Sequence, residues 1–315
     1  MNTPPLNPAA RTLRALLRTE ACLPAPGVYD CLSAMLAAEA GFSAVSLSGY
    51  SMEASQFGLP DLGFMGLTDV ETVARRVCAS TSLPVICDAD TGYGGPGNVW
   101  QTVRRLEAAG VAGLHIEDQA DPKKCGGLPG RRVISVQDMA AKIRAACSAR
   151  VDPDTVVIAR SDAFASEGLD AVSARLNAYL ASGADLAFAA ENYSLDEVRR
   201  LARMVEGPLA ICGGVPGWSG SHETVDAYAE IGVRLVIYPF TSLFVAAKAM
   251  RAGYAEMALR GGFDSEMVGT RMIDFSDFGR FIGVDVWSAR EAGFGDAANG
   301  KEQHGHRSKQ HEQPL

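Results

Sequence analysis

Carboxylates repeatedly follow short apolar segments in this sequence. Asp88 and Asp90 come directly after residues 85–87, and Glu117 comes directly after residues 113–116. Apolar segments of this length are typical of buried strands. A carboxylate at the end of each buried strand is costly unless the strand ends converge on a cation. The pattern therefore predicts a divalent cation in a site lined by oxygen atoms, although solvated loop acids would give the same spacing.

Asp88, Asp90 and Glu117 are the candidate metal ligands. Residues two apart on a strand point to the same face, so Asp88 and Asp90 could both reach one ion. Glu117 would complete the set from a neighbouring strand, directly or through water. Mg2+ keeps several waters and takes few protein carboxylates, so these residues suit Mg2+, with Mn2+ as a substitute, better than Zn2+.

Other polar residues lie at the ends of the predicted strands. Arg160 is the candidate partner for a substrate carboxylate, because its planar guanidinium can form two parallel hydrogen bonds with one. An ion pair with Asp162 or Glu117 is the alternative role for Arg160. Tyr29 and His115 are further candidate catalytic residues.

Residues 48–50 follow another predicted strand and are candidate substrate-binding residues. The backbone N–H groups of Ser48 and Gly49 could meet an anion, since glycine permits a close approach. Tyr50 follows them directly. This signal is weak when it is taken alone.

The loop 118–132 is long and rich in glycine, and it carries a lone cysteine, Cys125, beside Lys123 and Lys124. Cationic neighbours lower a thiol pKa and favour the thiolate, so the sequence predicts a reactive cysteine. The glycines could act as hinges of a lid that closes over substrate. An ordinary surface loop with an incidental cysteine is the alternative.

Lysine placement bears on the reaction type. The chain has lysines at positions 123, 124, 142, 248, 301 and 309, and none of them ends a predicted strand. A Schiff-base aldolase needs such a lysine, so this mechanism is disfavoured. Metal-stabilised enolate chemistry remains as the route to carbon–carbon cleavage.

The elements that must position these residues alternate between eight apolar strands and eight amphipathic or alanine-rich helices, which predicts a (β/α)8 barrel. A doubly wound sheet is the alternative, but no GxGxxG follows the first strand. The predicted strands span residues 25–30, 44–48, 84–88, 112–117, 155–160, 185–190, 208–212 and 234–238. The predicted helices span residues 31–40, 69–80, 98–109, 136–148, 168–182, 194–205, 221–231 and 240–253.

The sequence beyond the barrel has a different character. We predict a barrel domain over 1–262, a helical extension over 263–295 and a disordered polar tail over 296–315. The extension carries apolar residues that the eight-fold alternation does not use, so they need another surface, either a neighbouring subunit or their own barrel. These residues are Met267, Met272, Ile273, Phe275, Phe278, Phe281 and Ile282.

Composition limits the partners and the compartment. The 315 residues carry a net charge of −8, which disfavours nucleic-acid binding. The seven cysteines show no CxxC pair, which fits a reducing cytoplasm. No segment approaches the length of a membrane span, and the N-terminus lacks the apolar core of a signal peptide. We therefore expect a cytoplasmic protein with a small-molecule ligand.

The motifs together resemble those of the isocitrate lyase and phosphoenolpyruvate mutase superfamily. The nearest branch contains the methylisocitrate and dimethylmalate lyases and carboxyvinyl-carboxyphosphonate phosphonomutase. The matching segments are PGVYD (26–30), SG (48–49), LPDLG (59–63), DADTGYG (88–94), HIEDQ (115–119), KKCG (123–126) and RSD (160–162).

This resemblance implies a role for most of these segments. It implies a barrel that binds Mg2+ through Asp90, with Asp88 and Glu117 acting mainly through water. It also implies a 2-oxo or 2-hydroxy carboxylate held by Ser48, Gly49 and Arg160, and a lid-borne Cys125 that transfers a proton. Asp61, Lys124 and Gly126 join the substrate-binding set. The assembly implied is a homotetramer, a dimer of dimers in which paired subunits exchange their last barrel helix.

Three positions depart from the lyase pattern. Position 127 is glycine where the lyase loop has histidine, and the acid near the sixth strand is moved by one residue, from Ala190 to Glu191. A shift of one residue on a strand turns a side chain to the opposite face. Cys212 stands where the lyases have asparagine. These positions handle the distal carboxylates of the substrate, so the far end of the site is predicted to be smaller and less polar.

The function predicted from these features is Mg2+-dependent cleavage of a carbon–carbon bond in a 2-hydroxy carboxylic acid. The product is a 2-oxo acid such as pyruvate or glyoxylate, and the reverse condensation uses the same residues. The alternatives are a phosphonomutase or a related carbon–phosphorus enzyme and, from another class, a non-catalytic binding subunit.

Overall fold

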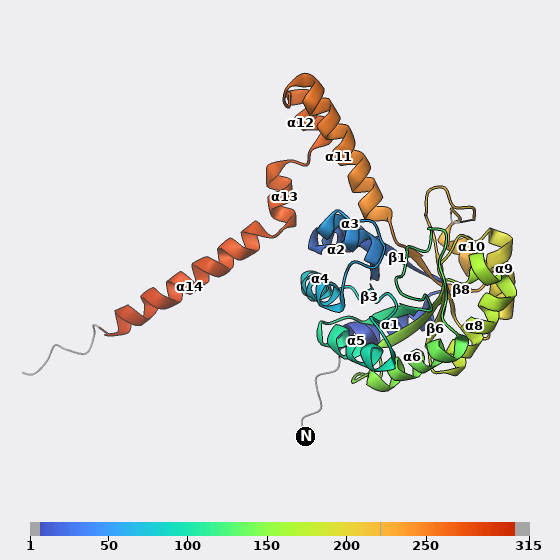
Figure 1. The fold of residues 1–315 in the computed structure, drawn as a ribbon. Coiled ribbons are helices and arrows are strands. Elements are labelled where there is room, and N and C mark those ends of the chain that lie inside the picture. Colours follow the sequence, from blue (N-terminus) through green and yellow to red (C-terminus); the bar gives the residue numbers. More distant parts are fainter. Residues whose placement is uncertain (1–6, 221, 306–315) are drawn as a thin grey trace, which may run out of the picture. The chain divides into compact units, whose positions relative to one another are not determined.

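Eight parallel strands form a closed barrel in the part of the chain that this computed structural model describes, residues 7–220 and 222–305 (Figure 1). β1 pairs with β8, with Leu23 opposite Leu235, and this pairing closes the barrel. The predicted (β/α)8 fold is confirmed. The strands are β1 Leu23–Val28, β2 Val45–Leu47, β3 Val85–Asp88, β4 Gly113–Glu117, β5 Val156–Ser161, β6 Leu186–Ala189, β7 Leu209–Cys212 and β8 Val233–Tyr238.

Helices follow the strands and cover the outside of the barrel. Hydrogen-bonded caps start several of them, as in α9, where Ser194 and Glu197 form a capping box. The helices that match the predicted alternation are α2 Cys31–Glu39, α4 Leu67–Ser80, α5 Pro96–Ala108, α6 Val136–Ala149, α8 Leu169–Ala181, α9 Leu195–Met204, α10 Val225–Glu230 and α11 Thr241–Arg260.

Three helices fall outside the predicted alternation: α1 Pro8–Thr19, α3 Gly49–Phe57 and α7 Phe164–Glu167. Helix α1 packs against the start of β4, where a Cβ added to Gly113 would lie 2.9 Å from Leu13 Cδ2. Leu13 belongs to the cluster of inward-facing barrel residues, together with Ile86 and Ile158. Helix α1 therefore closes the end of the barrel that lies opposite the carboxyl ends of the strands.

The remaining helices belong to a second unit. Contacts group the chain into Met1–Ala247 and Lys248–Leu315, a division that falls inside α11 and earlier than the predicted boundary at 262. The second unit contains the rest of α11 with α12 Ser265–Arg271, α13 Phe275–Phe281 and α14 Val284–Gly305. Helix α14 extends into the segment 296–315 for which disorder was predicted, and residues 306–315 lie outside the described residues.

Most of the large apolar residues of this second unit are exposed in the single chain. Phe275 is 92% exposed and Leu259 is 87% exposed. Met267, in contrast, is buried, so it is not free to cover another surface as we had predicted. None of the described helices is both long and apolar enough to span a bilayer.

Candidate active site

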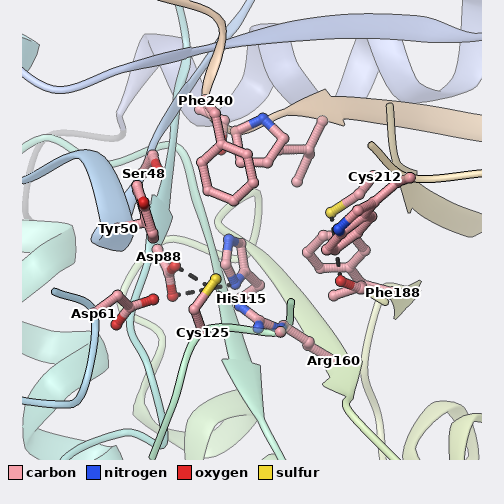
Figure 2. Close-up of a pocket in the computed structure, with 16 residues that line it drawn as sticks. Ser48, Tyr50, Asp61, Asp88, His115, Cys125, Arg160, Phe188, Cys212 and Phe240 are labelled. Atoms are coloured by element: carbon pink, nitrogen blue, oxygen red, sulfur yellow. Dashed lines mark hydrogen bonds and ion pairs between the residues drawn. The ribbon is translucent and has the colours of Figure 1, made fainter. Parts of the chain in front are cut away.

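A cavity opens at the carboxyl ends of the barrel strands (Figure 2). Predicted residues that line it include Asp88 from β3, His115 from β4, Cys125 from the loop after β4 and Arg160 from β5. Ser48, Tyr50, Asp61 and Gly126 line it as well. Parallel strands present their carboxyl ends on one side of a barrel, which explains why segments far apart in sequence meet here.

Asp88 and Asp90 converge beside the first turn of α3. A Cβ added to Gly49 would lie 2.9 Å from Asp88 Oδ2 and 3.4 Å from Asp90 Oδ1. The Gly49 N–H donates to Asp88 Oδ2 over 3.3 Å, and Ser48 caps α3, so glycine is needed for this close approach. The positive N-terminal end of α3 therefore faces a carboxylate of the site rather than a substrate anion.

The convergence has a different cause from the one predicted. Strand β3 ends at Asp88, and Asp90 sits in the following turn with φ of 47°, in the left-handed region. The alternation of a strand therefore does not direct Asp90, as we had reasoned. A non-glycine residue held in this conformation stores about 1–3 kcal/mol of strain and is frequent at functional sites.

Lys123 occupies the space next to Asp90. Its Nζ lies 2.5 Å from Asp90 Oδ1 and also contacts Asp61 Oδ1, and its side chain is almost fully buried. Burial opposes the charge, but Asp90 and Asp61 outweigh it and raise the pKa of Lys123 well above its usual value. Lys123 is thus a fixed cation and not a nucleophilic amine, which strengthens the argument against a Schiff base.

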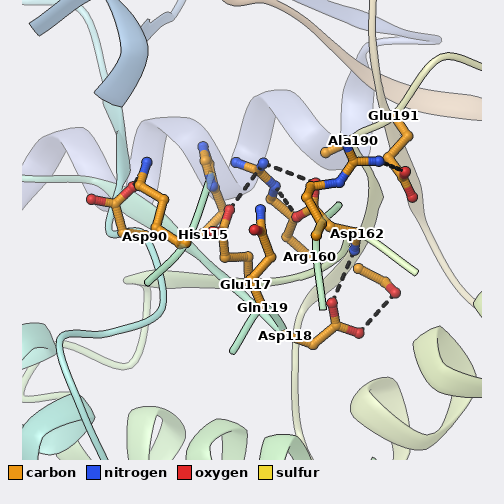
Figure 3. Close-up of polar contacts among 12 residues, drawn as sticks. Asp90, His115, Glu117, Asp118, Gln119, Arg160, Asp162, Ala190 and Glu191 are labelled. Atoms are coloured by element: carbon orange, nitrogen blue, oxygen red, sulfur yellow. Dashed lines mark hydrogen bonds and ion pairs between the residues drawn. The ribbon is translucent and has the colours of Figure 1, made fainter. Parts of the chain in front are cut away.

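Arg160 is held by carboxylates on two sides (Figure 3). Its Nε and Nη2 donate to the two oxygens of Asp162 over 2.8 and 3.0 Å, and Nη2 lies 2.9 Å from Glu117 Oε2. Both alternative ion pairs considered for Arg160 therefore exist. Its Nη1 lies 3.7 Å from Asp88 Oδ2 at the cavity, so Arg160 is oriented by its partners and still faces the site.

A buried hydrogen-bond network around Asp118 holds the end of β5 that carries Arg160. Asp118 accepts hydrogen bonds from Ser161 Oγ, the Asp162 N–H and Tyr179 OH over 2.8, 2.9 and 2.8 Å. Arg175 Nη1 lies 3.4 Å from the same carboxylate. Asp118 therefore fixes the end of β5, which carries Arg160.

The titration of the core groups follows from their burial. Burial raises the pKa of Glu117 well above its usual value and that of Asp90 to about 6. Burial also opposes the charge on Asp88, but His115, Arg160 and Lys123 outweigh it and lower its pKa to about 2. Burial lowers the pKa of His115 to about 4, so this imidazole is neutral at pH 7.

The loop with Cys125 is folded over the cavity. The Cys125 N–H donates to the Asp61 carbonyl over 3.0 Å, and the Leu128 N–H donates to the Cys125 carbonyl over 2.9 Å. A Cβ added to Gly126 would lie 3.0 Å from Asp162 Oδ1 and 3.1 Å from the Ala190 carbonyl. Glycine at 126 therefore allows the loop to lie in direct contact with Asp162 and the Ala190 carbonyl.

Cys125 itself differs from the prediction. It is 9% exposed, not a surface thiol, and burial raises its pKa to about 11. The cationic neighbours do not produce a thiolate, because desolvation of the charged form exceeds their attraction. Cys125 is consequently a protonated thiol at neutral pH, which suits a proton donor.

Five predicted residues do not line the cavity. Gly49, Asp90 and Glu117 contact groups that do line it, whereas Tyr29 and Lys124 are directed elsewhere. The Tyr29 side chain packs against the apolar core between the barrel strands and the surrounding helices. The Tyr29 N–H donates to Ser33 Oγ. Lys124 is held by Gln119 through its backbone, and its Nζ lies 3.5 Å from the Pro129 carbonyl. Neighbouring residues of an extended loop point in opposite directions, so Lys123 faces the site and Lys124 does not.

Two residues that complete the site are not among the predicted site residues. Lys123 is one of them, and the sequence offers only its place beside Lys124 and Cys125 as a signal. Glu53 was also missed. Its buried carboxylate accepts from the N–H groups of Leu62, Phe64 and Met65 and thereby fixes the loop that carries Asp61.

The three positions that depart from the lyase pattern lie together at the far end. Ala190 and Cys212 line the cavity, and the Cys212 thiol lies 3.7 Å from the Ala190 carbonyl. Glu191 is turned away from the cavity and pairs with Arg131 (Figure 3). Strand β6 ends at Ala189, so the loop after the strand directs Glu191, not the strand alternation on which the prediction rests. A Cβ added to Gly127 would lie 3.1 Å from Trp218 Cζ2, so the indole closes the space above this glycine.

The donor set fits a hard divalent cation. Asp90 Oδ1 and Glu117 Oε2 each touch a cation but accept no hydrogen bond from the described residues, which is costly for buried carboxylates. Among the described residues no group of three His, Cys, Asp or Glu side chains converges as a metal cage. The two cations of the site, Lys123 and Arg160, face an excess of buried carboxylates: Asp61, Asp88, Asp90, Glu117 and Asp162.

The model of the phosphoenolpyruvate phosphomutase family matches residues 13–258, which span the whole barrel. The chain belongs to this family. The match includes every residue of the cavity described above. The predicted resemblance to the isocitrate lyase and phosphoenolpyruvate mutase superfamily is therefore confirmed.

Several characterised members of the family are similar to this chain over most of its length. The 2,3-dimethylmalate lyase of Eubacterium barkeri is 36% identical over 89% of this chain and 96% of its own. The 2-methylisocitrate lyase of Halalkalibacterium halodurans is 42% identical over 76% of this chain and 79% of its own.

Solved structures of family members have the same fold. The crystal structure of 2,3-dimethylmalate lyase superposes with a TM-score of 0.84 and 36% identity, covering 92% of this chain and 97% of that chain. Phosphonopyruvate hydrolase in complex with oxalate and Mg2+ superposes with a TM-score of 0.81 and 28% identity, covering 90% and 98%.

Proposed function

We propose that this protein is a Mg2+-dependent lyase that cleaves the C2–C3 bond of a 2-hydroxy carboxylic acid and releases a 2-oxo acid. One observation carries the proposal. A protonated thiol, Cys125, lines the same cavity as Arg160 and Asp88. A buried acid facing a carboxylate-binding cation suits carbanion protonation, and the lyases among the relatives perform chemistry of this kind.

Different residues of the chain bind the substrate and transfer the protons. Arg160, oriented by Asp162, binds the C1 carboxylate, and Ser48 and Tyr50 line the same cavity. A base in the site takes the hydroxyl proton, the C2–C3 bond breaks, and the C2 carbonyl forms. Cys125 Sγ gives its proton to C3 of the departing fragment. The hydroxyl proton restores the thiol over the cycle, so no further reactant is needed.

Asp90 would hold the Mg2+ ion, and Asp88 and Glu117 would act mainly through water. When bound, the ion stabilises negative charge on the hydroxyl oxygen and the 2-oxo acid. Lys123 neutralises part of the carboxylate excess beside Asp90. The phosphonopyruvate hydrolase complex with oxalate and Mg2+ supports this choice of metal, for which Mn2+ is a substitute.

We assign the working enzyme to the cytoplasm as a homotetramer. All seven cysteines are free thiols, which fits a reducing compartment. Helix α11 buries none of its residues in the single chain. Its large apolar side chains are therefore exposed, with Val245 at 65% and Tyr254 at 66%. A second copy of the chain would cover such a surface in an oligomer.

A substrate screen tests the reaction class. The purified protein is incubated with Mg2+ and a panel of 2-hydroxy acids, and release of pyruvate or glyoxylate is followed with a reductase-coupled assay. Phosphonopyruvate and phosphoenolpyruvate are tested in parallel by phosphorus NMR. Rearrangement or cleavage of the carbon–phosphorus bond, with no hydroxy acid cleaved, would replace the lyase by the phosphonomutase alternative. Tight Mg2+–oxalate binding with no turnover of any compound would indicate a non-catalytic member.

A further inference from the structure

The cavity has a polar side and an apolar side. Figure 2 shows Asp61 and Asp88 on one side, with Phe188 and Cys212 on the other and Cys125 between them. The apolar side is completed by side chains from β6 to β8 and the loops after them. It consists of Phe188, Ala190, Cys212, Trp218, Ile237 and Phe240.

Arg160 reaches the apolar side, where its guanidinium carbon lies 5.9 Å from the centre of the Phe188 ring, but two further charged groups nearby are turned away. Glu191 pairs with Arg131, and its oxygens also accept from the N–H groups of Phe164 and Ala165 over 2.5 and 3.2 Å. Neither Glu191 nor Arg131 lines the cavity. Among the described residues that line the cavity, Arg160 is the only Arg or Lys, and the proposed function assigns it to the C1 carboxylate.

The proposed reaction itself requires two carboxylates. One lies on C1 beside the hydroxyl group, and a second must lie on C3, because the electron pair left there needs an adjacent carbonyl group. Any further substituent on C3 would extend from the polar side toward the apolar one. A third carboxylate there would be buried without a cationic partner, which is strongly unfavourable.

We propose, on the basis of the proposed function, that the substrate is a 2-hydroxy dicarboxylic acid with an alkyl group on C3, not a tricarboxylic acid. Trp218 sets the length of this alkyl group. Its ring lies against Gly127 and lines the end of the cavity, where a larger residue at 127 would displace it.

Two 2-methylmalates that differ only in the C3 substituent test the charge preference. One carries a propyl group, and the other carries a carboxymethyl group, which makes it 2-methylisocitrate. Pyruvate release is measured at saturating Mg2+ over a range of concentrations. We expect kcat/KM to be at least about 10²-fold higher for the propyl compound, because the far wall offers the carboxymethyl group no counter-charge.

The outcomes separate this inference from the proposed function. Equal or faster cleavage of 2-methylisocitrate would overturn the inference and leave the lyase assignment intact. Failure to cleave either compound, or any other 2-hydroxy acid, would remove the lyase assignment and the inference with it. A binding measurement gives a second readout, since pentanoate should bind to the enzyme with Mg2+ and pyruvate at least about 10-fold more tightly than succinate.

Trp218→Ala tests the length limit. The cavity becomes longer, so the preferred C3 chain should lengthen by one or two methylene groups, seen as a changed ratio of kcat/KM values within a methyl-to-pentyl series. Trp100→Ala is the matched control, because Trp100 lies on α5 outside the cavity and is 39% exposed. An unchanged chain-length profile in a folded Trp218→Ala enzyme would show that the indole does not limit the substrate.

Discussion

Lys123 Nζ lies 2.5 Å from Asp90 Oδ1 and also contacts Asp61, so one ammonium group joins the predicted metal ligand to the loop that carries Cys125. Both carboxylates are almost fully buried. Lys123 therefore links the position of the loop that carries Cys125 to the charge of the predicted metal site. Asp90 and Lys123 are the first residues to test.

Asp90→Ala should abolish activity while leaving the fold intact. The carboxylate serves the cation rather than the apolar core, and Lys123 keeps Asp61 as its partner. Activity is measured at saturating Mg2+ and again with excess chelator, and thermal unfolding is followed by circular dichroism. Asp196→Ala is the control, since the Asp196 side chain is 88% exposed. Full turnover of the wild-type enzyme with excess chelator would contradict the metal assignment.

Lys123→Met should be far more damaging than Lys124→Met. Removing Lys123 leaves the buried Asp61 and Asp90 without their cation, which typically costs about 3–5 kcal/mol of unfolding free energy. Lys124 contacts only loop groups, so its variant should retain near-normal stability and turnover. Urea unfolding and initial rates are compared for both. Equal effects of the two substitutions would mean that the assignment of the inward-facing lysine is wrong.

Cys125→Ser should lower turnover by about 10²–10⁴-fold, the usual contribution of a general acid. Alkylation by iodoacetamide gives a second test, because only the thiolate reacts. The pKa of Cys125 is raised to about 11, so the thiolate fraction and the labelling rate should rise about tenfold per pH unit between pH 7 and 9. Mass spectrometry of the Cys125 peptide measures this rate.

Mg2+ together with oxalate should slow the labelling of Cys125, since ligand binding keeps the loop over the cavity. Fast labelling at pH 7 that is independent of pH would show a preformed thiolate and would exclude the proton-donor role as described. Normal turnover of Cys125→Ser would remove the main support for a lyase and would favour the phosphonomutase alternative.

Truncation after residue 262 should dissociate the proposed homotetramer or unfold the chain, whereas removal of 296–315 should leave the assembly unchanged. The exposed apolar residues Ile273, Phe275 and Trp287 lie in the segment that only the longer truncation removes. Light scattering of the purified protein at micromolar concentration measures the mass. A monomer mass for the full chain would refute the exchange of helices between subunits.

The sequence alone determined the barrel and most of the cavity. Buried parallel strands are nearly continuous apolar segments, so β3, β4 and β5 could be recognised locally. The carboxyl ends of such strands meet at one side of the barrel, which was enough to place Asp88, His115 and Arg160 in one site.

Only the tertiary structure decided which loop residues face the site. Asp90 lies in a left-handed turn, and Lys123 and Lys124 differ by one step of an extended loop, so no sequence periodicity fixes their directions. The pKa of Cys125 depends on how far the loop is buried, and burial outweighs the charges that the sequence places beside it. Trp218 meets Gly127 across more than ninety residues of chain, a contact that arises because loops after different strands fold over the same opening of the barrel.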